Sequence, residues 1–318
     1  MKKIFIAGHR GMVGSTILSL LKKKKCKIIT VDKKKLNLLD QKKVFKFLKE
    51  KKPKEVYICA AIVGGIYANS SMPAKFLYEN LAISINLIHG CYLNNITKIL
   101  YLGSSCIYPR QSKVPIKEEY LLGGYLEKTN EAYAISKIAG LAMCKFYNKQ
   151  YIKKNIDFRA VMPSNLYGPG DNFDPKNGHV IPSLIYKFHD AKIKNKKKVI
   201  LWGDGTPKRE FLHVHDMAKA CLHLMSIAKN KFYELEKDNE HINIGSGEEI
   251  SIINLAKIIS NIVDYKGKVV FDRTKPNGTL SKVMDSRRIK KMGWKAKVKL
   301  EDGIRLTYSY FLENNAKR

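Results

Sequence analysis

A doubly wound α/β fold with a smaller α/β carboxy-terminal lobe is the architecture that this 318-residue sequence predicts. In the first half of the chain, short apolar runs alternate with amphipathic stretches, which is the pattern of parallel strands joined by crossover helices. A glycine-rich turn follows the first apolar run, and after about residue 165 the chain becomes rich in Gly, Pro, Asn and Asp. We therefore expect a parallel sheet covered by helices on both faces, followed by a second lobe.

Apolar runs and helical periodicity place the elements in order. In the first lobe we expect strands at 3–8, 26–31, 55–61, 98–105 and 157–163, and helices at 15–23, 41–51, 73–93 and 131–151. The turn-forming composition of 165–179 predicts a loop. In the second lobe we expect helices at 180–193, 215–228 and 251–263, strands at 198–205, 241–246 and 268–272, and a final helix. The predicted domains are 1–165 and 166–318, with segments around 206–235 returning to the first domain.

The charge balance is strongly basic, with 59 Lys and Arg against 28 Asp and Glu and a formal net charge of +31. Such an excess is compatible with nucleic-acid binding, or with a lysine-rich solvated surface that attracts small anions. The lysine runs at 22–25, 33–35 and 192–198 fall at helix ends and in loops, without interleaved aromatics. This distribution favours the solvated surface, and we expect no nucleic-acid partner.

Cysteine usage and hydropathy indicate a cytoplasmic protein. The six cysteines are scattered and form no C-x-x-C pair, which is typical of a reducing compartment. No apolar run is long enough to span a bilayer, and the amino terminus is better explained as a buried first strand than as a signal peptide. His213 and His215 have no cysteine pair nearby, so we expect no metal site.

Three glycines, Gly8, Gly11 and Gly14, follow the first strand and open a helix. Glycines at this point allow a tight turn and let a pyrophosphate approach the backbone amides of a helix amino terminus. The first domain is therefore predicted to be a Rossmann-type dinucleotide-binding domain. At the end of the second strand, Asp32 could accept a hydrogen bond from an NAD ribose. Lys33 and Arg10 could instead neutralise the 2′-phosphate of NADP, and these two cations favour NADP.

Two further motifs carry candidate chemistry. The stretch "GSSC" ends a strand, and its Cys106 either packs as a small hydrophobic residue or lies in a pocket and moves protons. In "YAISK", Tyr133 and Lys137 are four residues apart and share one helix face. A neighbouring ammonium is expected to lower the pKa of a tyrosine, which can then donate a proton to a carbonyl oxygen. Alone, such a pair is also common on amphipathic surfaces.

Together, the glycine turn, "GSS" at a strand end and Y-x-x-x-K resemble the extended short-chain dehydrogenase/reductase superfamily. The segments "GHRGMVGS", "AAIVGGI", "GSSCIYP", "TNEAYAISKIAG", "MPSNLYGP", "HVIPSLI" and "REFLHVHDMA" resemble, in order, the GDP-L-fucose synthase family. The similarity covers essentially the whole chain. Cysteine in "SSC" and histidine in "HVIP" are more specific to that family than the superfamily motifs are.

This resemblance implies an NADP(H)-dependent enzyme that epimerises GDP-4-keto-6-deoxy-D-mannose at C3 and C5 and then reduces the C4 ketone. Cys106 matches the family's epimerisation base, and His179 matches the acid. Ser104 and Tyr133 match the groups that hydrogen bond to the C4 oxygen, and Lys137 matches the residue that holds the nicotinamide ribose and lowers the tyrosine pKa. Thiol and imidazole pKa values are expected to lie close enough to neutrality to exchange protons.

The resemblance also implies ligand contacts. The matching cofactor positions are Gly8, Arg10, Gly11, Met12, Val13, Gly14, Lys33, Leu36, Asn37, Leu38, Leu102, Gly103, Ser104, Ser105, Lys137, Pro163, Ser164, Asn165, Leu166 and His179. The matching substrate positions are Ser104, Cys106, Tyr133, Asn165, Lys187, Trp202, Arg209, Asn277 and Lys282. Asn277 stands where an aspartate is expected, near the guanine end.

Two other functions remain open on the sequence alone. Relatives with the same cysteine and histidine can act on GDP-4-keto-6-deoxy-heptoses, either with or without epimerisation. A non-catalytic sugar-nucleotide-binding protein would also keep this fold. Finally, the helices at 73–93 and 131–151 carry more apolar surface than one sheet face needs, which predicts a homodimer through a four-helix contact.

Overall fold

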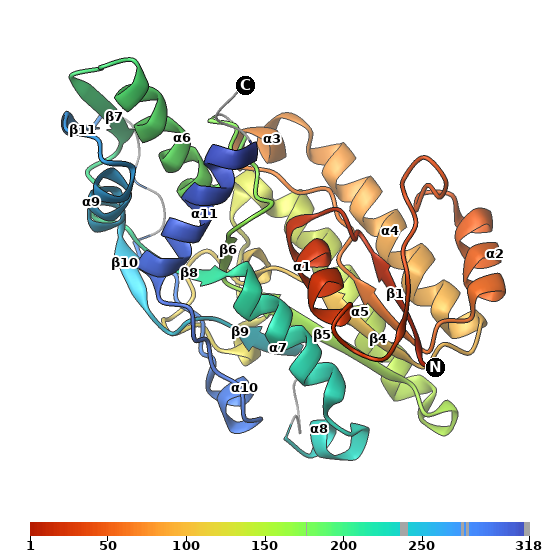
Figure 1. The fold of residues 1–318 in the computed structure, drawn as a ribbon. Coiled ribbons are helices and arrows are strands. Elements are labelled where there is room, and N and C mark those ends of the chain that lie inside the picture. The colour runs from red at the N-terminus through yellow and green to blue at the C-terminus, as the bar shows by residue number, and fades with distance from the viewer. Residues whose placement is uncertain (176, 236–240, 275–276, 278–279, 315–318) are drawn as a thin grey trace.

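A six-stranded parallel sheet forms the first lobe of the computed structural model, which describes residues 1–175, 177–235, 241–274, 277 and 280–314 (Figure 1). The strands lie in the order β2-β1-β3-β4-β5-β9. Their bounds are β1 Lys3–Ala7, β2 Lys27–Ile29, β3 Glu55–Ile58, β4 Lys98–Leu102, β5 Asp157–Pro163 and β9 His241–Ile244. From β1 the chain first adds β2 on one side and then β3, β4 and β5 on the other, so the strand order reverses between β1 and β3. The carboxyl ends of these two strands therefore border the crevice in which such sheets bind ligands.

Helices cover both faces of this sheet. One face carries α2 (Gln41–Lys51), α4 (Pro73–Leu93) and α5 (Glu131–Gln150), and the other carries α1 (Met12–Leu21) and α7 (Val214–Ser226). In β1, Phe5 packs into the first core, whereas Ile4 and Ile6 pack into the second. Strands buried on both sides explain the continuous apolar runs of the sequence. No helix in the described ranges is long and apolar enough to cross a membrane.

The second lobe has its own core. A three-stranded sheet has the order β10-β8-β6, and a parallel pair is formed by β7 and β11. The bounds are β6 Asn165–Tyr167, β7 Lys198–Trp202, β8 Lys208–His213, β10 Glu249–Ser251 and β11 Lys268–Asp272. The helices α6 (Val180–Ile193), α9 (Ile252–Val263) and α11 (Leu300–Asn314) pack together through buried residues such as Phe188, Leu255 and Ile304.

The structure differs from the sequence-based elements at several short segments. Residues 165–167, expected as loop, form β6, and the strands β8 and β10 were not expected at all. The segment 241–246, expected in the second lobe, supplies β9 of the first sheet. Three short helices are also additional, namely α3 Ile66–Ser71, α8 Lys229–Leu235 and α10 Arg287–Lys291. Elements of three to seven residues are too short to show a reliable periodicity.

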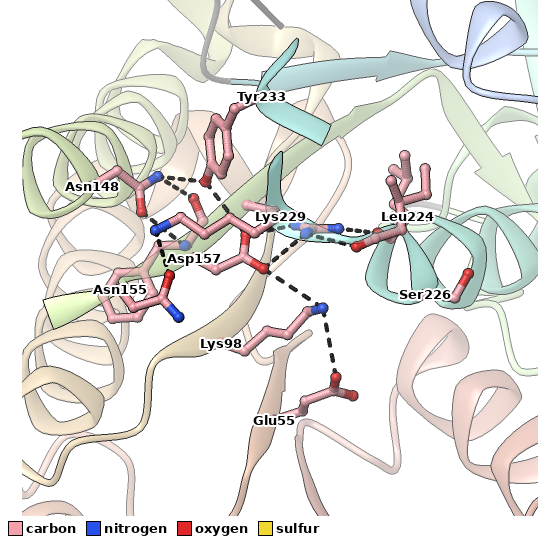
Figure 2. A network of polar contacts seen from close by, with 12 residues as sticks. Glu55, Lys98, Asn148, Asn155, Asp157, Leu224, Ser226, Lys229 and Tyr233 are labelled. Carbon is pink, nitrogen blue, oxygen red and sulfur yellow. Dashed lines mark hydrogen bonds and ion pairs between the residues drawn. The ribbon is translucent and has the colours of Figure 1, made fainter. Parts of the chain in front are cut away.

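A buried polar network joins the amino ends of β3, β4 and β5 to the end of α7 (Figure 2). Arg159, whose side chain is fully buried, donates to both carboxylate oxygens of Asp157 at 2.7 and 2.8 Å. The same guanidinium donates to the carbonyl of Leu224 and, at 2.9 Å, to that of Ile227. Lys98 lies 3.6 Å from Asp157. The guanidinium thus joins β5 to backbone carbonyls at the end of α7 and just after it.

Candidate active site

A cleft at the carboxyl end of β1 and β3 contains many of the predicted cofactor positions. Its volume is about 260 Å³. The predicted positions among its lining residues are Gly8, Arg10, Gly11, Lys33, Leu36, Asn37 and Leu38. Met12, Val13 and Gly14 follow directly in the chain, and Met12 begins α1. A glycine turn that leads into a helix amino terminus can accept a pyrophosphate, so these residues fit a dinucleotide.

Local geometry explains two of the three glycines in the turn. Gly8 has φ +87°, in the left-handed region that side chains rarely adopt, and a Cβ there would be 2.6 Å from the amide nitrogen of Ala60. A Cβ on Gly14 would overlap the carbonyl oxygen of Gly8. A larger residue at Gly8 would therefore displace the segment after β3, one at Gly14 would move α1 away from β1, and in both cases the cleft would change shape.

The two candidate selectors of the cofactor form one ion pair. Asp32 accepts from Arg10 Nε at 2.7 Å and lies 3.3 Å from His9 Nε2. The carboxylate is therefore already engaged by a cation, and Lys33 lines the same cleft. Arg10 is largely exposed, so its side chain can turn toward a ligand at small energetic cost.

The cleft also includes residues that the sequence analysis missed. Ala60, Ala61 and Ile62 line the cleft directly after β3. Their loop is held by Asn80 of α4, whose side chain accepts from Ile62 N at 2.8 Å and donates to Ile62 O at 3.0 Å. Asn80 is only 2% exposed. A buried asparagine within an apolar helix is the signal that could have indicated this role.

Four predicted catalytic residues converge at the end of β4. Ser104 caps a short 3-10 turn, Ser105–Ile107, and accepts from Cys106 N at 3.4 Å. Helix α5 brings Lys137 to the same place, where its Nζ donates to Leu102 O at 2.8 Å and lies 5.7 Å from the ring centre of Tyr133. The helix can approach closely because residue 140 is glycine. Any side chain at this position would overlap the ring of Tyr101.

Burial dominates the titration of Tyr133. Desolvation raises its pKa well above the ordinary value, and a hydrogen bond with Ser104 opposes the rise only in part. The pKa of Tyr133 is therefore raised overall, and not lowered as expected. The Lys137 ammonium is itself buried, which lowers its pKa to about 8, and it donates to a backbone carbonyl. A phenol in this environment is neutral and suited to donating a proton.

Cys106 is buried as well, and burial raises the pKa of its thiol. The expectation of a pKa close to neutrality is therefore wrong for this residue. The ammonium of Lys282 opposes the rise most strongly, followed by a hydrogen bond with Ser104 and the charge of Lys137. Lys282 is a predicted substrate position, and its own pKa is lowered by burial and by the charge of Arg209, while Cys106 acts in the opposite direction.

His179 comes from the second lobe, at the amino cap of α6. Its Nδ1 lies 3.5 Å from Asp171 Oδ1, and its side chain is 47% exposed. The Asp171 carboxylate raises the pKa of the imidazole, although burial acts in the opposite direction. The structure thus gathers Ser104, Cys106, Tyr133 and Lys137 into one cluster and pairs His179 with a carboxylate instead.

The remaining predicted substrate positions are spread over the second lobe. Lys187 is half-buried on α6, and burial lowers its pKa. Trp202 ends β7 and is 71% exposed. Asn277 is exposed and accepts from Asp204 N at 3.0 Å, which places it at the turn after Trp202. Arg209 lies on β8, half-buried, and donates to Lys208 O at 2.7 Å.

Pro163, Ser164, Asn165 and Leu166 connect the two lobes. Pro163 ends β5, and Asn165 begins β6. Ser164 is buried, and its hydroxyl has no partner among the described residues. Asn165 donates to Glu210 O at 2.9 Å, which fixes the start of β6 against β8.

Comparisons with known proteins agree with this arrangement. The model of the "NAD dependent epimerase/dehydratase family" matches residues 4–245. GDP-L-fucose synthase of Escherichia coli K12 is 48% identical over 315 residues, which cover 98% of this chain and 97% of that protein.

Two solved structures are also similar. A GDP-6-OMe-4-keto-L-xylo-heptose reductase from Campylobacter jejuni has a TM-score of 0.92 at 36% identity, covering 99% and 98% of the two chains. A GDP-L-fucose synthetase from Naegleria fowleri bound to NADP has a TM-score of 0.89 at 28% identity, covering 100% and 96%.

The match to the family model spans most of the chain, and the E. coli relative matches almost end to end. The cleft with its glycine turn and the cluster of serine, cysteine, tyrosine and lysine lie within the matched residues. The chain therefore belongs to the NAD dependent epimerase/dehydratase family and is an enzyme of the GDP-L-fucose synthase type.

Proposed function

We propose that this enzyme converts GDP-4-keto-6-deoxy-D-mannose to GDP-L-fucose, by inverting C3 and C5 and then reducing the C4 ketone. The observation that carries the proposal is the cluster of Ser104, Cys106, Tyr133 and Lys137 beside the glycine-lined cleft. A ketone acidifies the C–H bonds on either side of it, so one cluster that binds the C4 oxygen can serve both the epimerisation and the reduction.

The proposed cofactor is NADP(H), which supplies hydride for the reduction when it is bound. Arg10 and Lys33 would hold a 2′-phosphate, because Asp32 is already compensated by Arg10 and does not repel a further anion strongly. The residues of the cleft and of the glycine turn would hold the rest of the dinucleotide. The related structure bound to NADP supports this choice.

Ser104 and Tyr133 are proposed to act on the C4 oxygen. Both can donate hydrogen bonds to it, which stabilises the negative charge that develops when a proton leaves C3 or C5. Tyr133 would then give its proton to the oxygen during reduction. The raised pKa of Tyr133 fits this role, since the proton stays on the phenol until the oxygen becomes basic.

Cys106 and His179 are proposed to move the protons at C3 and C5. Inversion needs a base on one face of the sugar ring and an acid on the other. The raised pKa of His179 favours the protonated imidazole, which is the form that an acid requires. The thiol of Cys106 must lose its proton, and the charge of Lys282 is the largest effect that favours this loss.

Product analysis tests the proposed reaction directly. The enzyme is incubated with GDP-4-keto-6-deoxy-D-mannose and NADPH, and the sugar is identified by NMR. We expect NADPH oxidation and GDP-L-fucose. A product with the starting configuration at C3 and C5 would overturn the epimerase part. No turnover would indicate a non-catalytic binding protein.

A heptose substrate is the second candidate. The C. jejuni structure, which is named as a reductase of a GDP-4-keto-heptose, matches this fold with a TM-score of 0.92. The same cluster could therefore reduce a GDP-4-keto-6-deoxy-heptose, with or without epimerisation. Measured kcat/KM values for the hexose and the heptose would decide between the two. A preference for the heptose of more than about tenfold, equal to about 1.4 kcal/mol, would favour this second function.

Replacing Cys106 with Ser is expected to separate the two half-reactions. A hydroxyl is a far weaker base than a thiolate, so deuterium uptake from solvent at C3 and C5 should fall by about 10²- to 10⁴-fold. Reduction of a ketone that needs no epimerisation should continue. Cys26→Ser is the matched control, because Cys26 is half-buried just before β2 and its thiol donates to Leu21 O. Equal uptake in the two variants would contradict the role of Cys106.

A homodimer through α4 and α5 stays a prediction. Its support is a set of exposed apolar side chains, Tyr78 and Ile85 on α4, and Ile135 and Phe146 on α5. Sedimentation at micromolar concentration should show a dimer, and Ile85→Glu combined with Phe146→Glu should shift it toward monomer. Ile200→Glu, at an exposed apolar position on β7, is the control that should leave the dimer intact. A wild-type monomer would contradict the prediction.

We also propose that the enzyme works in the reducing cytoplasm. All six cysteines are free, and Cys91 and Cys144 are buried in the core between the sheet and its helices. Burial raises the pKa of both thiols, which makes them unreactive. Free thiols persist in such a compartment.

A further inference from the structure

A buried carboxylate in the loop between β6 and α6 has no role in the reaction as described so far. The side chain of Asp171 is 4% exposed, and its Oδ1 lies 3.5 Å from His179 Nδ1 and accepts from Asn172 N at 2.8 Å. Its Oδ2 is buried and has no partner in the described chain. Burying a carboxylate that is only partly paired costs free energy, so its presence here calls for a compensating function.

The loop holds His179 at the carboxyl edge of the first sheet. Near its start, a Cβ on Gly170 would lie 3.6 Å from Met12 Cα, at the beginning of α1. Near its end, Asn177 O accepts from Gly65 N at 3.0 Å, in the connection between β3 and α3. The loop thus runs from the glycine turn of the cleft to the segment after β3.

The ring of His179 has one nitrogen engaged and one available. Nδ1 faces Asp171, whereas Nε2 makes no hydrogen bond or ion pair in the described chain, and the side chain is 47% exposed. Hydrogen bonding at one imidazole nitrogen determines which nitrogen carries the proton and which way the ring points. A carboxylate at Nδ1 favours a proton there and leaves Nε2 to exchange protons with a ligand.

We propose that Asp171 is the positioning residue of His179: it holds the Nδ1–H and thereby directs Nε2 toward the sugar carbon that receives a proton. The proposal rests on the function proposed above, in which His179 is the acid. In that step the Nε2–H bond breaks, a C–H bond forms, and the enolate electron pair moves from oxygen to carbon. The imidazole is left neutral with its proton on Nδ1, Asp171 stays ionised, and solvent restores the proton on Nε2.

The charges around the imidazole support the same assignment. Asp171 is the charged group of the described chain that shifts the pKa of His179, and the shift is upward. Asp174 lies in the same loop, but its carboxylate accepts from the loop amide Asn177 N at 2.7 Å. Lys282 acts on Cys106 instead. A raised pKa means that the protonated acid persists to higher pH, and proton return fails as pH rises through that pKa.

Asp171→Asn tests the proposal, because it keeps an oxygen for Asn172 N while removing the charge. The measurement is deuterium uptake at C3 and C5 of GDP-4-keto-6-deoxy-D-mannose, as a function of pH, with the oxidised cofactor present. We expect the rate to fall about 10- to 100-fold. The decrease of the rate at high pH, the alkaline limb of the profile, should also begin at lower pH, because His179 loses the carboxylate that raises its pKa. Asp174→Asn is the matched control and should leave the limb in place.

Failure of this proposal is distinguishable from failure of the proposed function. If His179→Gln leaves deuterium uptake unchanged, His179 is not the acid, and the proposed function loses that assignment. If His179→Gln slows uptake strongly but measurably, while Asp171→Asn changes neither the rate nor its decrease at high pH, Asp171 has no positioning role. In the His179→Gln background, Asp171→Asn should have no further effect, whereas a second, additive loss would indicate a merely structural residue.

A measurement on the unmodified enzyme supplies an independent check. Nitrogen NMR of the labelled histidines reports the tautomer of the neutral ring. We expect His179 to carry its proton on Nδ1 and to titrate above the ordinary value for histidine. A neutral ring protonated on Nε2 would overturn the proposal.

Discussion

Tyr133→Phe is expected to abolish reduction of the C4 ketone while the protein stays folded. The phenol is the proposed proton donor, and its raised pKa keeps the proton on the oxygen that the substitution removes. General acid catalysis contributes about 10²- to 10⁴-fold, so the rate of NADPH oxidation in a single turnover should fall by that amount. Deuterium uptake at C3 and C5 should fall less, because Ser104 can still donate to the C4 oxygen.

Tyr101→Phe is the matched control for this experiment. The Tyr101 ring lies 5.0 Å from Lys137 Nζ, closer than the ring of Tyr133, and its hydroxyl contacts Ser84 at 3.3 Å. The substitution removes a buried hydroxyl from the same neighbourhood but leaves the proposed proton donor in place. Reduction should therefore stay within a few-fold of the wild-type rate. If the two variants reduce the ketone equally well, the assignment of Tyr133 is wrong.

Arg159→Met should cause the largest loss of stability. The substitution leaves the buried carboxylate of Asp157 without its closest cation and removes the side-chain donor to the Leu224 and Ile227 carbonyls. Removing one partner of a buried ion pair typically costs about 3–5 kcal/mol. We expect a decrease of this size in the free energy of unfolding, measured by urea titration with an unchanged m-value.

The control for the stability experiment is an exposed ion pair of the same chemistry. Arg305 donates to Glu301 at 2.7 Å on the surface of α11, and both side chains are more than half exposed. Arg305→Met should cost about 0–1 kcal/mol, the usual range for surface pairs. A similar cost for the two substitutions would show that the buried network of Figure 2 does not hold β5 to α7.

Three of the longer helices could be predicted from the sequence to the residue. The helices expected at 41–51, 73–93 and 180–193 are confirmed as α2, α4 and α6. Each spans three or more turns, so its apolar stripe repeats often enough to be recognised. The strands β6 and β10 have three residues each, and they are defined by pairing with distant segments instead of by a local pattern.

The residues of the candidate site also differ in whether a local sequence pattern indicates them. Cys106 and Lys137 could be named because each lies in a short motif whose local structure, a strand end or a helix face, is predictable. Asp171 could not, because its significance depends on a contact across a loop that only the folded chain defines. The pKa values of Tyr133 and Cys106 are higher than the sequence suggested. Desolvation raises them, and it depends on the depth of burial, which neighbours in sequence do not determine.

The position of β9 has a consequence for biosynthesis. This strand pairs with β5, yet about eighty residues of other structure separate the two in the chain. While the ribosome is still producing those residues, β5 is an open edge with unpaired backbone groups, and all seven of its residues are of the kind that the finished molecule buries. A nascent or prematurely terminated polypeptide that ends before residue 241 would therefore expose β5 as an apolar edge strand. Such a strand can bind chaperones or nucleate aggregation.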